Sequence, residues 1–243
     1  MLTTEHTWNA FYGQHGPRGQ CREWYLTARA ACQHVLSSNS SSNNSSNSNN
    51  SSSSSSSSSS NNSSNSNNSS SSSSNSINSW GECLHSGCGN SSLSFLLHEA
   101  LGGAVVNTDF SAPVLSAMRA RYPGVRFRRE DARRMSFARG RFGLIVDKGT
   151  LDAMSSDSGE SERNVAQGLA EYRRVLRDEG GRRGGAAAGV CLVFSLFGLD
   201  YWRPFLERAP GWAWDVQVLD ATPHFDVVGA DDGGEEEEEE EEE

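Results

Sequence analysis

The stretch Cys83–Ser92, CLHSGCGNSS, decides the fold of this 243-residue chain. An apolar run reaches the turn 87–89, Gly-Cys-Gly, and leucines at helical spacing begin at Leu93. Glycines let the backbone bend sharply and approach a ligand closely, where a Cβ would clash. A strand, a glycine turn and a helix start form the nucleotide-binding corner of a Rossmann-like sheet, although ordinary strand-to-helix turns use the same residues.

Two segments of low complexity flank or interrupt the remaining sequence. Every residue from 37 to 79 is Ser or Asn except Ile77, and such a tract has nothing to bury, which predicts disorder. The chain ends with Asp231, Asp232 and nine glutamates at 235–243, a self-repelling run that we expect to be extended. These eleven acids carry a charge of −11, whereas the whole chain carries −10, so residues 1–230 have a net charge of +1. The tail is either a solubilising run or a docking arm for a basic partner.

The five cysteines are odd in number and form no CxxC pair. The sequence therefore predicts neither a disulfide framework nor a metal site, and it fits a reducing compartment. The first residues lack the basic and apolar regions of a signal peptide, and no run approaches the ~18 apolar residues that a membrane helix needs. We expect a cytoplasmic protein without a membrane partner.

Strands and helices alternate after the Ser/Asn tract. We expect strands at 80–86, 104–109, 125–131, 142–147 and 190–197, helices at 91–101, 112–122, 160–177 and 200–208, and a closing antiparallel pair at 212–219 and 224–228. This alternation predicts an α/β, Rossmann-like three-layer sandwich with a seven-stranded, mainly parallel sheet and one antiparallel strand near the C-terminus. The expected units are an N-terminal aromatic helical cap (1–36), the low-complexity insertion (37–79), the core (80–230) and the acidic tail (231–243).

Three carboxylates, Asp109, Asp131 and Asp147, each stand at the end of a predicted strand. Ligands of such sheets bind beyond the carboxyl ends of the strands. One carboxylate at a strand end often only caps the next turn, but three beside a glycine turn favour a binding site. Asp109 lies twenty residues after Gly89, the separation at which an acid accepts hydrogen bonds from a ribose diol.

A ribose is present in both NAD and S-adenosylmethionine, so other residues must distinguish these two cofactors. NAD sites favour a third glycine three residues after the second, and here that position is Ser92. Asp131 with Ala132 suits an adenine edge, and aromatic faces attract the cationic sulfonium. The residues favour S-adenosylmethionine over an NAD-dependent oxidoreductase, and a non-catalytic scaffold with the same fold stays open.

Five motifs appear in a recognisable order: LHSGCGNSSLS (84–94), VNTDFS (106–111), EDARRMSF (130–137), FGLIVDKGTLDAM (142–154) and EYRRVL (171–176). With the N-terminal WNAFYGQHGPRGQCREWYL (8–26), they resemble class I methyltransferases of the methyltransferase-like 13 group. That group includes the lysine methyltransferases of translation elongation factor 1 alpha. The resemblance covers nearly everything except the Ser/Asn tract and the acidic tail. It implies protein-lysine N-methylation with S-adenosylmethionine, and a lysine-bearing partner protein such as a translation factor.

The resemblance also implies a cofactor site built from the aromatic segment, the glycine turn and the strand ends: Trp8, Tyr12, Trp24, Gly87, Asp109, Phe110, Asp131, Ala132 and Asp147. In this assignment Gly87 contacts the methionine moiety and Asp109 the ribose hydroxyls. Phe110 lies beside the adenine, whose edge meets Asp131. From spacing alone, Trp8 and Tyr12 share one face of a helix, which either anchors the segment on the sheet or walls a pocket.

The resemblance places Asp147 and Lys148 near the methionine end and the acceptor entrance. Lys148 is the only lysine of the chain. A lysine acceptor must be neutral to attack, and either Asp147 or Asp152 is expected to orient it while its proton leaves to water. No Asn/Asp-Pro-Pro-aromatic motif follows the fourth predicted strand, which disfavours an amide or adenine nitrogen as acceptor.

Nine arginines lie between Arg119 and Arg141. They form either a solvated face or a basic rim that attracts an acidic protein or a nucleic acid. No aromatic residues are interleaved in the manner of a nucleic-acid surface, so nucleic acid is the weaker partner candidate.

Overall fold

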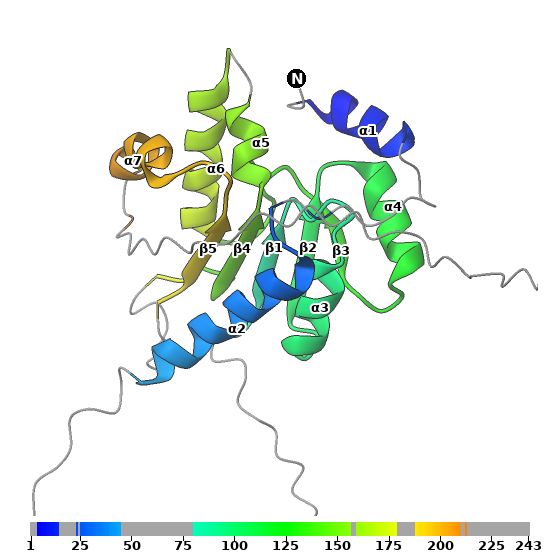
Figure 1. Cartoon of the computed structure of the whole chain (residues 1–243), viewed down its shortest axis with the longest axis horizontal. Helices are drawn as coiled ribbons and strands as arrows, with labels where there is room; N and C mark the ends of the chain where they lie inside the picture. Colours follow the sequence, from blue (N-terminus) through cyan, green and yellow to red (C-terminus); the bar gives the residue numbers. More distant parts are fainter. Residues whose placement is uncertain are drawn as a thin grey trace, which may run out of the picture.

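The computed structural model describes residues 4–14, 23, 25–44, 80–156, 159–178, 188–209 and 212. In this part of the chain, five parallel strands form one sheet in the order β3-β2-β1-β4-β5 (Figure 1). The strands are β1 (Cys83–Ser86), β2 (Val105–Asp109), β3 (Phe127–Arg129), β4 (Leu144–Lys148) and β5 (Val190–Phe194). The order grows outward from β1 in both directions, as in doubly wound α/β folds. The Rossmann-like parallel sheet is confirmed, whereas the predicted closing strands lie outside the described residues apart from Trp212.

The helices are α1 (Glu5–Gln14), α2 (Ala28–Asn44), α3 (Leu93–Ala100), α4 (Ala112–Arg121), α5 (Thr150–Ser155), α6 (Ser161–Val175) and α7 (Leu199–Arg208). Six of them lie where the sequence predicts helices, because α1 and α2 both begin in the predicted helical cap (1–36). The short α5 is not predicted, because it lies in a stretch without helical periodicity. In the described part of the chain, no helix combines the length and the hydropathy that a membrane-spanning segment requires.

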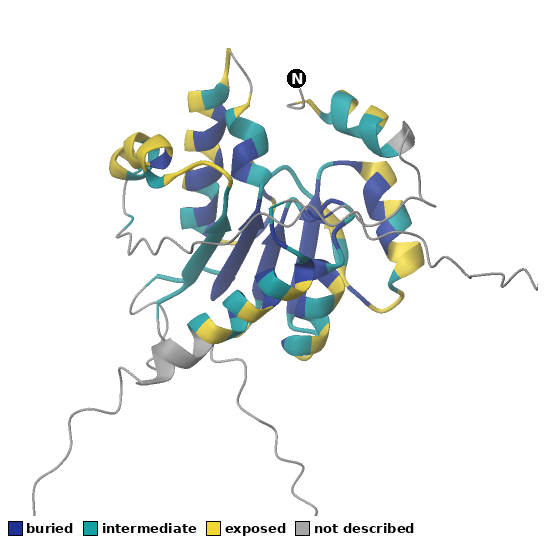
Figure 2. Cartoon of the chain, in the orientation of Figure 1, coloured by how far each residue is buried: buried dark blue, intermediate teal, exposed yellow. Residues whose placement is uncertain are grey.

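The core divides between the two faces of the sheet. Alternate strand residues such as Cys83 and Leu144 pack with α2 and α3 on one face, while Leu84 and Ile145 pack with α6 and Trp202 of α7 on the other. Figure 2 shows the central strands buried along their length. A sheet that is covered on both faces is typical of parallel strands, and the result is a three-layer arrangement.

Helix α2 continues into the Ser/Asn tract and ends at Asn44. The prediction of disorder is therefore corrected for residues 37–44. Extending a helix costs much less than nucleating one, and residues 28–36 already form its first turns. The hydroxyls of Ser37 and Ser38 also donate hydrogen bonds to the carbonyls of Gln33 (2.8 Å) and His34 (2.9 Å) in the preceding turn. The rest of the tract lies outside the described residues.

Candidate active site

A cavity of about 290 Å³ lies at the carboxyl ends of the central strands. Its walls come from α1, the glycine turn after β1, the ends of β2 and β4, helix α5, and the segments after β3 and β5. The strands β2 and β4 flank β1 on opposite sides, so the cavity lies at the switch point where doubly wound sheets bind ligands. Its volume is close to the lower end of the range for ligand pockets, about 300–1,000 Å³.

The glycine turn forms part of this cavity. Gly87 (φ 57°) and Gly89 (φ 52°) both have left-handed backbone conformations, which favour glycine. A Cβ at Gly87 would lie 2.0 Å from the hydroxyl oxygen of Thr150, and one at Gly89 would lie 2.7 Å from the Tyr12 hydroxyl. Both glycines are therefore needed for conformation and for space, and the turn brings α1 and α5 against the end of β1.

Asp109, at the end of β2, faces the cavity and fixes the glycine turn. Its carboxylate accepts hydrogen bonds from the backbone N–H groups of Gly89 (3.0 Å) and Ser111 (2.8 Å). Burial raises the pKa of Asp109 to about 6, although these backbone hydrogen bonds oppose the shift. The backbone N–H of Phe110 also bonds this carboxylate. A carboxylate offers about four acceptor positions, so these three bonds leave room for a hydroxyl donor of a ligand.

Helix α1 walls the cavity with two stacked rings. The centroids of Trp8 and Tyr12 are 5.5 Å apart, and both rings line the cavity, so the shared helix face is confirmed. Burial, and next the charge of Asp109, raise the pKa of the Tyr12 phenol. Helix α1 lies beside α4 (Figure 1), where Asn9 accepts a hydrogen bond from the Ser111 hydroxyl at 2.7 Å. The segment is thus both anchored and cavity-forming, whereas Trp24 lies outside the described residues.

Asp147, the last acid of β4, caps α5. Its carboxylate accepts hydrogen bonds from the backbone N–H groups of Thr150 (2.8 Å) and Leu151 (3.2 Å) and from the Tyr172 hydroxyl (2.7 Å). Burial raises the pKa of Asp147 to about 7, and the bonds from Tyr172 and Thr150 oppose this shift. The side chain is fully buried, and its bonds direct it into the protein rather than into the cavity. Its predicted cofactor contact stays a prediction.

Lys148 lines the cavity, but its ammonium group forms a buried ion pair with Glu23. The Nζ–Oε2 distance is 2.9 Å, and only 2% and 3% of the two side chains are exposed. Glu23 also accepts hydrogen bonds from the Ser91 hydroxyl (2.7 Å) and from the backbone N–H of Ser92 (2.9 Å). The ion pair therefore fastens the N-terminal segment to the start of α3. The sequence analysis assigned no role to Glu23, although the N-terminal motif (8–26) contains it.

Tyr25 is a second cavity residue that sequence reasoning missed. A Cβ at Gly149 (φ 84°) would lie 3.0 Å from the Tyr25 ring, so glycine is needed there. Tyr25 itself has φ 72° and is the only non-glycine residue of the described chain with a positive φ. Burial, and next the neighbouring Asp152 carboxylate, raise the pKa of the Tyr25 phenol.

Asp131 and Ala132 follow β3 and line the cavity as predicted. The Asp131 carboxylate is already paired, because Arg133 donates to it from its Nη2 (2.7 Å) and from its backbone N–H (2.9 Å). Burial would raise the pKa of Asp131, but the bonds from Arg133 lower it overall. An adenine amine would share this carboxylate with Arg133. Phe110, also predicted, lines the same cavity.

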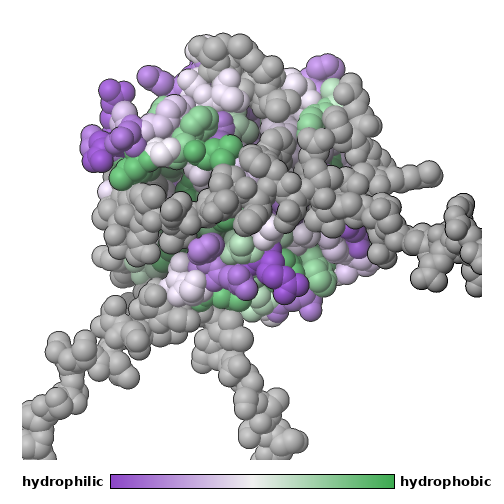
Figure 3. Space-filling model, viewed as in Figure 1, coloured by the Kyte–Doolittle hydropathy of each residue, from purple (hydrophilic) through white to green (hydrophobic). Residues whose placement is uncertain are grey.

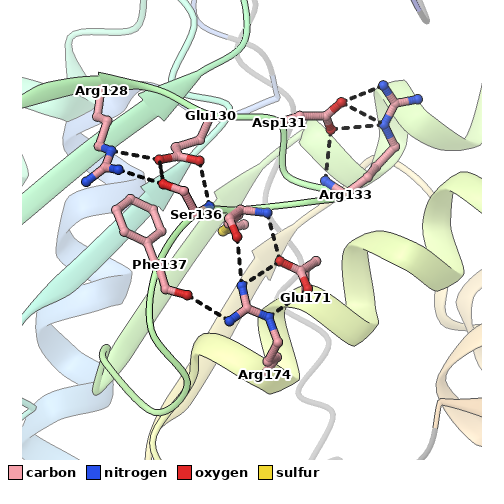
Figure 4. A network of polar contacts seen from close by, with 9 residues as sticks. Arg128, Glu130, Asp131, Arg133, Ser136, Phe137, Glu171 and Arg174 are labelled. Atoms are coloured by element: carbon pink, nitrogen blue, oxygen red, sulfur yellow. Dashed lines mark hydrogen bonds and ion pairs between the residues drawn. The ribbon is translucent and has the colours of Figure 1, made fainter.

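A polar network holds the segment after β3 against α6 (Figure 4). Glu171 accepts a hydrogen bond from the backbone N–H of Met135 (2.8 Å), and Arg174 donates to the carbonyls of Met135 (2.9 Å) and Phe137 (2.7 Å). Six of the nine arginines between 119 and 141 form ion pairs with carboxylates: Arg126, Arg128, Arg129, Arg133, Arg139 and Arg141. These pairings favour local roles for the arginines over a basic rim.

The cavity opens beside an apolar surface next to α7. Leu196 and Phe197 line the cavity and yet are 51% and 42% exposed. Phe197 stacks on Tyr201 of α7, with ring centroids 4.4 Å apart. Apolar atoms gather on the surface near α7 in Figure 3. Exposed apolar side chains therefore border the cavity next to α7.

Residues 83–180 match the model of a family described as "Methyltransferase domain". The chain is similar to the EEF1A lysine methyltransferase 4 of Bos taurus, with 41% identity over 37% of this chain and 39% of the relative. It is also similar to the human eEF1A lysine and N-terminal methyltransferase, with 40% identity over 40% of this chain and 14% of the relative. The chain thus spans well under half the length of these curated relatives.

Among solved structures, the chain is similar to a TehB-like SAM-dependent methyltransferase from Corynebacterium glutamicum. The TM-score is 0.40 and the identity is 19%, over 53% of this chain and 64% of that chain.

Proposed function

We propose that this chain is a methyltransferase that uses S-adenosylmethionine and methylates a lysine side chain of a protein. The observation that carries the proposal is the cavity at the switch point, which Trp8 and Tyr12 cover and Asp109 borders. Most of its lining residues lie within 83–180, the part of the chain that matches the methyltransferase-domain model. The lysine acceptor is supported by the names of the relatives, which are described as eEF1A lysine methyltransferases.

The strand order supports a cofactor laid across the sheet. Asp131 follows β3, Asp109 ends β2 and Gly87 follows β1, and these three strands are neighbours. Adjacent strands are roughly 4.8 Å apart, so two steps span about 10 Å. In the proposed arrangement the adenine lies near Asp131, the ribose at Asp109 and the methionine at Gly87, which leaves β4 and β5 for the acceptor.

The residues of the cavity fit this cofactor. The rings of Trp8 and Tyr12 provide aromatic faces that attract cations, and the backbone at Gly87 is open to close approach because no Cβ is present. When bound, S-adenosylmethionine supplies the methyl group on a sulfonium. The protein then contributes alignment of the acceptor and exclusion of water, which lower the barrier of a displacement reaction.

We further propose a cytoplasmic protein partner with an exposed lysine, such as a translation elongation factor. The relatives' names support that class of partner, and the apolar rim at Leu196 and Phe197 offers a surface for it. Oxidoreductase chemistry with NAD is disfavoured, because Ser92 occupies the third-glycine position and its N–H is bonded to Glu23.

Calorimetry tests the cofactor site. We expect the wild-type chain to bind S-adenosylhomocysteine, the product form of the cofactor, and Asp109→Ala to lose that binding. Asp200→Ala is the matched control, because Asp200 is a fully exposed acid on α7. Unchanged S-adenosylhomocysteine binding by Asp109→Ala would refute the assignment of Asp109 to the cofactor site.

Labelling of a cell lysate with methyl-labelled cofactor tests the reaction. The expected result is one or a few labelled proteins whose hydrolysate contains methylated lysine. Label in another amino acid would contradict the lysine acceptor, and cofactor binding without any labelled protein would favour a non-catalytic scaffold.

A further inference from the structure

One buried carboxylate in the cavity has an oxygen without a partner. Asp152 of α5 is only 5% exposed and lines the cavity. Its Oδ2 accepts a hydrogen bond from the backbone N–H of Leu196 at 3.0 Å. Its Oδ1 has no hydrogen-bond partner among the described residues. A buried carboxylate oxygen is costly to leave unbonded, so this atom points to a ligand that donates to it.

The charges around Asp152 point to a cationic ligand. Lys148, the cavity's own ammonium group, is bonded to Glu23. The hydrogen bonds that act on the pKa of Asp152 come from Ser195, Leu196 and Tyr25, and none of these residues is charged. The carboxylate is therefore held by neutral groups alone in the described part of the chain. A buried charge is stabilised best by an opposite charge with hydrogen bonds.

The position of Asp152 suits an acceptor rather than the cofactor. Its partner Leu196 follows β5, and β5 is three strands away from β2, which carries Asp109. At roughly 4.8 Å per strand, this separation is about 14 Å. Asp152 therefore lies toward the exposed rim of Leu196 and Phe197, beyond the proposed ribose and methionine positions.

The walls near Asp152 also suit a lysine side chain. The cavity lining around it includes the ring of Tyr25 and the apolar side chains of Ala153, Met154, Leu196 and Phe197. The four-carbon stem of lysine packs well along apolar surface while its ammonium group meets a polar partner. Apolar walls beside a buried carboxylate match that side chain.

We propose that Oδ1 of Asp152 receives the ε-ammonium group of the acceptor lysine, an inference that rests on the proposed function. One ammonium proton passes to the carboxylate and from there to water. The neutral nitrogen then uses its lone pair to form the new N–C bond, while the carbon–sulfur bond breaks and its electron pair stays on sulfur. Tyr25 and the backbone N–H of Leu196 hold the carboxylate in place. Asp147 is assigned the capping of α5 instead.

Asp152→Asn tests the proposal because it removes the charge and keeps the shape. We expect S-adenosylhomocysteine affinity within twofold of the wild type by calorimetry, and methyl incorporation into lysate protein reduced about 100-fold, the lower range for a general base. Asp152→Glu should restore part of the rate. Asp200→Asn, an exposed acid on α7, is the control and should match the wild type in both assays.

A binding measurement without turnover completes the test. In protein labelled with ¹³C at aspartate carboxyl groups and saturated with S-adenosylhomocysteine, the signal missing from Asp152→Asn identifies Asp152. Titration with n-butylammonium chloride, a lysine side-chain mimic, should move that signal saturably. The same titration with n-butanol, which has the same stem without the charge, should not move it.

The outcomes separate the two proposals. Failure of the wild type to bind S-adenosylhomocysteine would refute the proposed function, and this inference would fail with it. Normal binding with no response of the Asp152 signal to n-butylammonium would overturn this inference alone. Weaker S-adenosylhomocysteine binding by Asp152→Asn, by tenfold or more, would also overturn it, because Asp152 would then hold the amine of the cofactor.

Discussion

The buried ion pair between Lys148 and Glu23 gives the sharpest prediction about stability. Lys148→Met removes the cation and keeps most of the volume, so Glu23 stays buried as an uncompensated charge beside Ser91 and Ser92. Both side chains are almost completely buried, and Nζ lies 2.9 Å from Oε2. Removing one partner of such a pair costs about 3–5 kcal/mol. That is a large share of the roughly 5–15 kcal/mol that stabilises a typical domain.

Urea unfolding, followed by tryptophan fluorescence, measures this loss, with the unfolding free energy taken by linear extrapolation. Limited proteolysis near residue 23 shows whether the N-terminal segment is released before the core unfolds. Glu23→Gln should also destabilise the protein. The double variant should lose less than the sum of the two single losses, with a coupling energy of up to about 3 kcal/mol.

A matched control separates this ion pair from ion pairs in general. Arg163 and Glu160 form an exposed pair whose side chains are 71% and 54% accessible. Arg163→Met should therefore cost less than about 1 kcal/mol. The reasoning is refuted if Lys148→Met unfolds at the same urea concentration as Arg163→Met, or if the double variant is additive.

Two further predictions concern the glycine turn and the cap of α5. Gly87→Ala should lower the free energy of unfolding by about 1–2 kcal/mol, because residue 87 has a left-handed backbone conformation. The new Cβ would also lie 2.0 Å from the Thr150 hydroxyl oxygen, and this clash should add to the loss. An unchanged urea midpoint and an unchanged affinity for S-adenosylhomocysteine would contradict this prediction. Because burial raises the pKa of Asp147 from 3.8 to about 7, its protonation favours the folded state: this contribution is present below about pH 4 and is lost as pH rises through 7. Relative to Asp147→Asn, the wild type should therefore become less stable between pH 5 and pH 8, and a pH-independent difference in urea midpoint would show that Asp147 is not perturbed.

The sheet and its helices were predictable because their signals are local. Buried runs such as 142–147 and the leucines from 93 onward report strand and helix through their spacing, and the glycine turn marks the corner between them. The same rule placed Asp109 and Asp131 correctly at the cavity. These features depend on chain direction and periodicity, which a single sequence carries.

The contacts that complete the cavity are not local, and for that reason they were missed. Glu23 meets Lys148 across most of the chain, and nothing in the spacing of either residue indicates that pairing. The choice between Asp147 and Asp152 had the same difficulty. Asp147 lies near the end of β4 and Asp152 follows it by five residues, and only the three-dimensional structure shows that Asp147 caps a helix while Asp152 faces the cavity.

The DKGTLD stretch (147–152) links the N-terminal segment to the cavity through short contacts. Lys148 bonds Glu23, Gly149 lies against Tyr25, and Thr150 donates a hydrogen bond to the Ser86 carbonyl at 3.0 Å beside the glycine turn. Helix α1 and Tyr25, which cover the cavity, belong to the segment that this stretch fastens. Loosening the ion pair should therefore weaken S-adenosylhomocysteine binding, even though the proposed cofactor position touches neither charge. Full affinity in a folded Lys148→Met variant would show that the cover closes without this link.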